Sequence, residues 1–184
     1  MPGKKLLVAT CAGHAQAERA IAELQTRGLG MENLSIFGKA FASDEEAIGF
    51  YTAGGQLLAC GGSVGFWERL WKLLGDGGVF FVPGVGAVAA AGPFVRRLVA
   101  TIDRGMPAGG LSTLGAALCR IGVPKSSIFR CEIEMKPSEY VLVALVSSDR
   151  VPDATIALKQ AGVSQITASD ERRLEAANKV LQTV

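Results

Sequence analysis

The sequence contains few residues of the kinds that support catalysis or metal binding. His14 is the only histidine among 184 residues, and the four cysteines lie far apart at Cys11, Cys60, Cys119 and Cys131. A structural zinc site normally needs four ligands, often supplied by closely spaced pairs of cysteines, and no such pair occurs. We therefore expect no metal and no cofactor. Scattered single cysteines indicate free, mostly buried thiols in a reducing compartment.

Other signatures of chemistry are also missing. The sequence has no G-x-S-x-G, no P-loop and no G-x-G-x-x-G between a strand and a helix. The formal net charge is +2 and no basic block is present, which argues against nucleic acid as a partner. Two lysines precede an apolar run at the N-terminus, but the run is too short for a signal peptide and predicts a first strand instead.

One pair of residues is an exception to this shortage of potentially reactive side chains. Cys11 and His14 are separated by two residues and lie where the first predicted strand meets the first predicted helix. A cysteine at a helix N-terminus can have a lowered pKa, so an enzyme using this pair is one hypothesis. The favoured interpretation is a thiol at a strand end and an exposed histidine at a helix start, in a protein that is not an enzyme.

The most informative stretch is the glycine-rich middle of the chain. Nineteen consecutive residues, Gly77–Val95, carry no charge, and five of them are Gly and two are Pro. The length is close to the roughly 20 apolar residues of a membrane-spanning helix. However, Pro83 lacks an amide proton, and Gly84 and Gly86 loosen the backbone. The pattern predicts two half-helices around a glycine-rich turn.

The flanks predict a compact α+β fold. Apolar runs and period-two alternation predict strands at 4–10, 34–39, 127–135, 140–146 and 164–169. Helical spacing predicts helices at 14–27, at 149–162 and from about residue 170. This order resembles a ferredoxin-like sandwich, an antiparallel sheet with helices on one face. We assign residues 1–48 and 123–184 to that domain and 49–122 to an inserted apolar helical region, with helices at 56–74 and 109–122.

Residues beside the apolar middle allow two interpretations each. Trp67, Trp71 and Tyr51 suit either an aromatic belt at a membrane interface or anchors in a protein core. Arg96 and Arg97 suit either anionic lipid headgroups or the C-terminal end of a half-helix.

Four segments, taken in order, resemble a known family. They are MENLSIFGK (31–39), IGFYTAG (48–54), FFVPGVGAVAAAGP (80–93) and LSTLGAALCRIGVPKSSIFRCE (111–132). The chain resembles, over about residues 4–148, the bacterial general-stress and heat-induced membrane-protein family of unknown function. The resemblance implies a small membrane-associated protein with no established catalytic residue, cofactor or substrate. Glu68, Arg69 and Lys72 depart from the family pattern and favour an interfacial or re-entrant hairpin, or a buried oligomer core.

The sequence therefore predicts a non-enzymatic, stress-linked protein. Its apolar hairpin is expected to enter the cytoplasmic side of the inner membrane or to join copies of the chain into a homo-oligomer. The alternative is a cytoplasmic homo-oligomeric scaffold or carrier that encloses an apolar ligand, or an adaptor of a larger complex. The residues predicted to form the membrane or self-association surface are Trp67, Trp71, Phe80, Phe81, Val82, Pro83, Gly84, Val85, Gly86 and Phe94.

Overall fold

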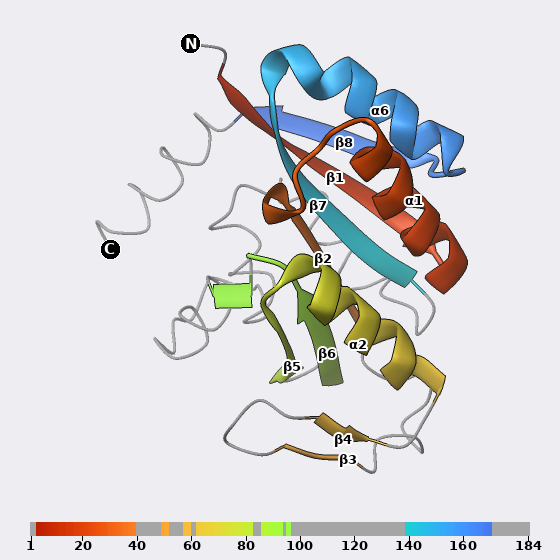
Figure 1. Ribbon diagram of the computed structural model, residues 1–184, viewed down its shortest axis with the longest axis vertical. Coiled ribbons are helices and arrows are strands. Elements are labelled where there is room, and N and C mark those ends of the chain that lie inside the picture. Colours follow the sequence, from red (N-terminus) through yellow and green to blue (C-terminus); the bar gives the residue numbers. More distant parts are fainter. Residues whose placement is uncertain are drawn as a thin grey trace.

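The computed structural model describes residues 3–39, 49–51, 57–59, 62–82, 86–93, 95–96 and 139–170. Within these ranges the chain forms eight strands, three α-helices and two short 3-10 helices (Figure 1). In chain order they are β1 (Lys4–Ala12), α1 (His14–Thr26), η1 (Met31–Asn33), β2 (Leu34–Lys39), β3 (Gly49–Tyr51), β4 (Leu57–Ala59), α2 (Gly62–Leu74), β5 (Gly77–Val82), β6 (Gly86–Ala91), β7 (Glu139–Ser147), η3 (Ser148–Arg150), α6 (Val151–Gln160) and β8 (Gln165–Asp170).

Six of the strands form one antiparallel sheet in the order β5-β6-β2-β7-β1-β8. The centre of the sheet is the long pairing of β1 with β7, which matches Lys4 with Ser147 and Ala12 with Glu139. β2 pairs with β7 on one side and with β6 on the other. β5 and β8 are the two edge strands. β3 and β4 pair with each other in a separate two-stranded sheet.

The helices α1, α2 and α6 pack on one face of the large sheet (Figure 1). Each helix buries one apolar stripe at helical spacing, as an amphipathic helix on a sheet must. The buried helix residues are Ala17, Ala20, Ile21 and Leu24 from α1, Phe66, Trp67, Leu70 and Leu74 from α2, and Ala154, Ala157 and Leu158 from α6. They meet alternate residues of the strands, among them Leu7, Ala9, Ile36, Ala89 and Leu142.

The intervening residues of the central strands are buried too. They point to the face opposite the helices and include Leu6, Val8, Phe37, Val88, Val141 and Val143, all at most 5 % exposed. The central strands are therefore apolar on both faces. Their sequences are continuous hydrophobic runs for this reason, and they do not alternate between apolar and polar residues.

The α+β class is confirmed, and so are four of the strands and two of the helices that were predicted in the flanks. The strands predicted at 4–10, 34–39, 140–146 and 164–169 are β1, β2, β7 and β8, with ends within two residues of the prediction. The helices predicted at 14–27 and 149–162 are α1 and α6, the latter preceded by η3. Pro152 lies in the first turn of α6, where its missing amide proton costs nothing. The predicted strand 127–135 and helix 109–122 lie outside the described residues.

The prediction of an inserted helical hairpin is wrong for residues 77–82 and 86–91. These two segments are paired antiparallel strands, β5 and β6, and β6 is hydrogen-bonded into the large sheet beside β2. The alanines of β6 favour helix in isolation, but tertiary pairing on both sides of the strand overrides that preference. Two smaller corrections accompany it. The helix predicted at 56–74 begins at Gly62, after strand β4. The final helix was predicted from about Asp170, which ends β8, and the residues after it lie outside the described part of the chain.

Candidate functional site

The residues that were predicted to form a contact surface lie mainly on the hairpin and on the helix above it. Phe80, Phe81 and Val82 belong to β5, and Gly86 begins β6. Trp67 and Trp71 belong to α2, which covers this end of the sheet. Pro83, Gly84, Val85 and Phe94 lie outside the described residues. The candidate site is therefore one region, the β5 side of the sheet with its covering helix.

Both tryptophan side chains of this region pack against other residues of the same chain. Trp67 is 1 % exposed and lies in the core between the helix and the sheet. Trp71 is half-buried, and its Nε1 donates a hydrogen bond of 2.9 Å to the carbonyl oxygen of Ala90 in β6. These positions agree with the interpretation of the tryptophans as core anchors.

A glycine at the start of β5 makes room for Trp71. A Cβ atom placed on Gly77 would lie 1.8 Å from Cδ1 of Trp71, far inside van der Waals contact. The indole ring thus packs directly on the backbone of the edge strand. This close approach explains part of the glycine content that suggested a membrane hairpin, because the glycine serves packing within the chain.

The open end of the hairpin is tied by two contacts. The amide of Gly92 donates a hydrogen bond of 2.6 Å to the carbonyl oxygen of Asp76. The Nε of Arg96 lies 2.7 Å from the Asp76 carboxylate. Arg96 thus pairs with an aspartate of its own chain, a role that differs from both earlier interpretations. The charges that border the uncharged stretch neutralise each other at the base of the hairpin.

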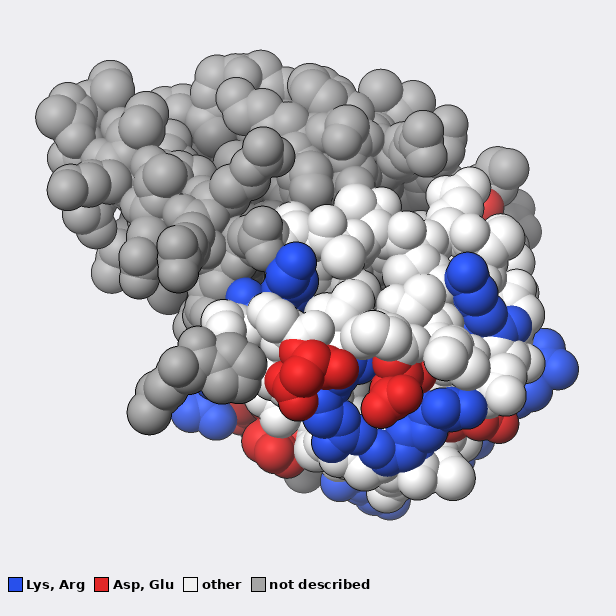
Figure 2. Space-filling model, turned by 90° about the horizontal axis from the view of Figure 1, so that it is seen from above, with Lys and Arg blue, Asp and Glu red and all other residues white. Residues whose placement is uncertain are grey.

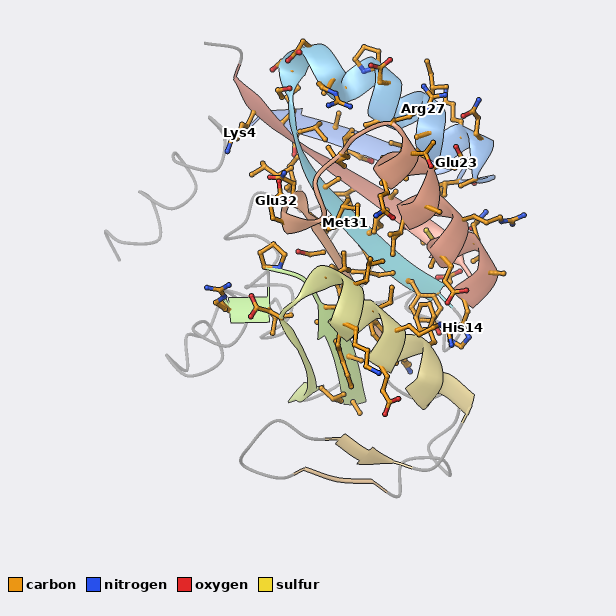
Figure 3. The ribbon with its side chains drawn as sticks, in the orientation of Figure 1. Lys4, His14, Glu23, Arg27, Met31 and Glu32 are labelled. Atoms are coloured by element: carbon orange, nitrogen blue, oxygen red, sulfur yellow. The ribbon has the colours of Figure 1, made fainter. Side chains whose placement is uncertain are left out.

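A cluster of aromatic rings joins α1, α2 and β7 (Figure 3). The ring of His14, at the start of α1, stacks on Phe66 with centroids 4.2 Å apart. Tyr140 lies within 5.1 Å of His14 and 5.0 Å of Phe66 by the same measure. Trp67 meets Phe66 and Tyr140 edge-on. The cluster locks the beginnings of the two helices to the start of the central strand.

The Cys11 and His14 pair is poorly suited to nucleophilic chemistry. Cys11 is fully buried opposite Tyr140 in the β1–β7 pairing, and burial raises the pKa of its thiol to about 12. A thiolate is the reactive species of cysteine, so this thiol is inert at neutral pH. Within the described part of the chain, no three His, Cys, Asp or Glu side chains are grouped to hold a metal ion.

A shallow groove runs between α1 and α2. Its volume is about 190 Å³, and it is lined by Glu18, Ile21, Ala22, Gln25, Arg69, Leu70 and Leu73. Arg69 bridges it through a 2.6 Å contact with Glu18, and Leu73 is 43 % exposed at its rim. The groove is open to solvent. It does not have the form of a closed chamber for an apolar ligand.

The described surface seen in Figure 2 carries Lys, Arg, Asp and Glu side chains of both signs close together. This face therefore has no broad field of one sign that would attract nucleic acid or an anionic membrane.

These features define an antiparallel α+β protein whose candidate site is a sheet edge. No family model matches the chain, and no curated protein or solved structure is significantly similar to it.

The aromatic cluster makes the stability of the fold dependent on pH. The pKa of His14 is lowered from 6.5, chiefly because burial disfavours the charged ring; Glu18 raises it and Arg69 lowers it. The other titratable neighbours, Cys11 and Tyr140, stay neutral because burial raises both pKa values to about 12. The unfolded chain therefore binds a proton at His14 more readily than the folded chain does. We expect the free energy of unfolding to fall as pH drops below about 6.5.

Urea denaturation at about pH 7.5 and about pH 5 measures this effect. His14→Phe keeps a ring that can stack on Phe66 but removes the titrating group. The loss of stability between the two pH values should be smaller in the variant than in the wild type. Equal losses would mean that His14 does not contribute to the pH dependence.

Proposed function

We propose that this chain is a non-enzymatic, self-associating protein, and that the β5–β6 hairpin is its contact surface. The observation that carries the proposal is the position of β5. It is an uncharged edge strand that pairs with β6 on one side and, among the described residues, with no strand on the other. An edge strand without charge offers its free backbone groups to another chain.

Self-association is better supported than insertion of the hairpin into a membrane. Val88, Ala89, Ala90 and Ala91 of β6 are at most 1 % exposed, and β6 is bonded to both β2 and β5. Insertion would separate β6 from β2 and break the hydrogen bond from Trp71 to Ala90. Backbone groups removed from a sheet into lipid lose their partners at a cost of several kcal/mol each. Among the residues that the structure describes, no helix is long and apolar enough to span a membrane.

We further propose that the scaffold is ferredoxin-like. This proposal is supported by the order β2-β7-β1-β8, with α1 between β1 and β2 and α6 between β7 and β8, because that fold interleaves a pair of βαβ units. β6 and β5 then extend the sheet beyond β2. The resemblance to the bacterial general-stress family supports a stress-linked role in the cytoplasm or at the cytoplasmic side of the inner membrane.

The test is the mass of the full-length chain purified without detergent. We expect sedimentation velocity over a wide range of concentrations to give a species that is a multiple of 19.2 kDa. Leu73→Ser is a matched control, because it removes an exposed apolar side chain from the groove side of α2 and leaves β5 unchanged. This variant should keep the mass of the wild type. A monomer at every concentration would overturn the proposal, and so would chain retained in carbonate-washed membranes.

A further inference from the structure

We infer that the partner of β5 is β5 of a second copy, paired antiparallel about a two-fold axis that passes between Val79 of one copy and Val79 of the other. This inference rests on the proposed self-association and specifies its geometry. The two six-stranded sheets would join into one continuous sheet, with the helices of both copies on the same face.

The hydrogen bonds at the base of the hairpin fix which backbone groups of β5 point outward. β5 and β6 pair in one register without a bulge, from Gly77 opposite Ala91 to Val82 opposite Gly86. The amide of Gly92 bonds to the carbonyl of Asp76, the next pair in that register. In an antiparallel ladder, hydrogen-bonded pairs alternate with non-bonded ones. Asp76, Gly78, Phe80 and Val82 therefore direct their amides toward β6, and Gly77, Val79 and Phe81 direct theirs away from it.

These three outward residues select the register of the dimer. Two antiparallel strands bond well only when outward residues stand opposite outward residues. One register uses all three outward residues. In it, Val79 stands opposite Val79 of the second copy, and Gly77 stands opposite Phe81. Each of these pairs exchanges two hydrogen bonds. Shifting the register by one pair in either direction loses one of these hydrogen-bonded pairs. In one direction the shift also brings in Pro83, which has no amide proton to donate.

Nothing in the sequence of β5 protects this edge. Natural edge strands are usually blunted by charged side chains, by proline or by bulges, and residues 77–82 have none of these. The opposite edge, β8, differs because it contains Asp170 and exposed Gln165 and Thr167. Asp76, the charged residue that directly precedes β5 in the sequence, is paired with Arg96 of its own chain. A second copy would therefore meet no unpaired aspartate at the start of the strand.

A second copy is the partner with the best fit, because an antiparallel edge is self-complementary under two-fold symmetry. A contact of six residues on each strand is small for a stable interface. We therefore expect a dimer that dissociates on dilution.

Amide hydrogen exchange of the wild type, resolved to single residues, tests the geometry directly. At high concentration the amides of Gly77, Val79 and Phe81 should be protected, and on dilution to monomer they should exchange quickly. The amides of Gly78, Phe80 and Val82 are the internal control, because their bonds to β6 keep them protected at both concentrations. Fast exchange of the outward amides in an oligomer would overturn the β5 pairing and leave self-association standing. A chain that is always monomeric would overturn both.

Two variants at the axis give independent evidence. Val79→Pro removes an outward amide proton and leaves the bonds to β6 in place, so it should abolish the dimer. Val79→Ala trims the same side chain but keeps the amide, and it should still form the dimer. Circular dichroism checks that both variants fold. A folded Val79→Pro variant that still forms the dimer would overturn the inference; if Val79→Pro fails to fold, the exchange pattern of the wild type decides.

Discussion

Replacement of Trp67 by alanine is expected to lower the free energy of unfolding by about 3–5 kcal/mol. The indole is 1 % exposed and lies at the junction of α2, β7 and the aromatic cluster. Its removal leaves a cavity beside the rings of Phe66 and Tyr140, which cannot close without moving α2 against β7. Urea denaturation followed by circular dichroism, at a concentration where the chain is monomeric, measures the loss.

The phenylalanine variant at the same position separates packing from polarity. Nε1 of Trp67 is buried, and it has no hydrogen-bond partner among the residues that the structure describes. A buried donor without a partner costs about 1–3 kcal/mol. Removing the indole N–H therefore regains part of the stability that the smaller phenyl ring loses in packing. Trp67→Phe should therefore cost less than about 1.5 kcal/mol, within the range of well-tolerated apolar replacements. A cost equal to that of the alanine variant would show that the indole N–H is satisfied in solution.

Gly92→Ala is expected to destabilise the fold by about 2–5 kcal/mol, from backbone strain and overpacking together. Gly92 has a φ of +101°, a region that residues with a side chain rarely adopt. A Cβ atom there would lie 2.3 Å from the carbonyl oxygen of Leu34 and 2.8 Å from Cα of Ser35. Both are backbone atoms at the start of β2, which is held between β6 and β7 and has little freedom to move.

Gly75→Ala is the matched control for this prediction. Gly75 has a φ of +92°, but a Cβ atom there would meet nothing within 4 Å. This variant should therefore suffer only the backbone strain, about 1–2 kcal/mol. The difference between the two variants, measured by urea denaturation, isolates the crowding against β2. Equal losses at the two positions would mean that β2 gives way to the added methyl group.

The flanking elements could be predicted because local signals and tertiary structure agree there. In α1, Ala17, Ala20, Ile21 and Leu24 recur at helical spacing, and Gly28 follows the helix with a φ of +76°. In α6, Pro152 stands in the first turn and Gly162 follows the end. Each signal acts within a few residues of chain, so the sequence alone is enough to locate these helices.

The hairpin could not be predicted in the same way because its strand character depends on distant residues. The alanines of β6 favour a helix until β2 and β5 pair with them. The one local signal was the run Val79–Val82, since branched and aromatic residues favour strands. The uncharged character of the region was evident from the sequence. Its place at an edge, and the direction of each amide, follow only from the pairing.

The order of the strands in the sheet also determines when the chain can fold during synthesis. β1 is made first, but both of its neighbours, β7 and β8, come from the last third of the described chain. Until Glu139–Ser147 leaves the ribosome, β1 has none of its partners among the described strands, and β2 lacks one of its two. Contacts so distant in sequence form slowly, and unpaired strands are prone to aggregation. We therefore expect the nascent chain to expose its most apolar strands through most of translation.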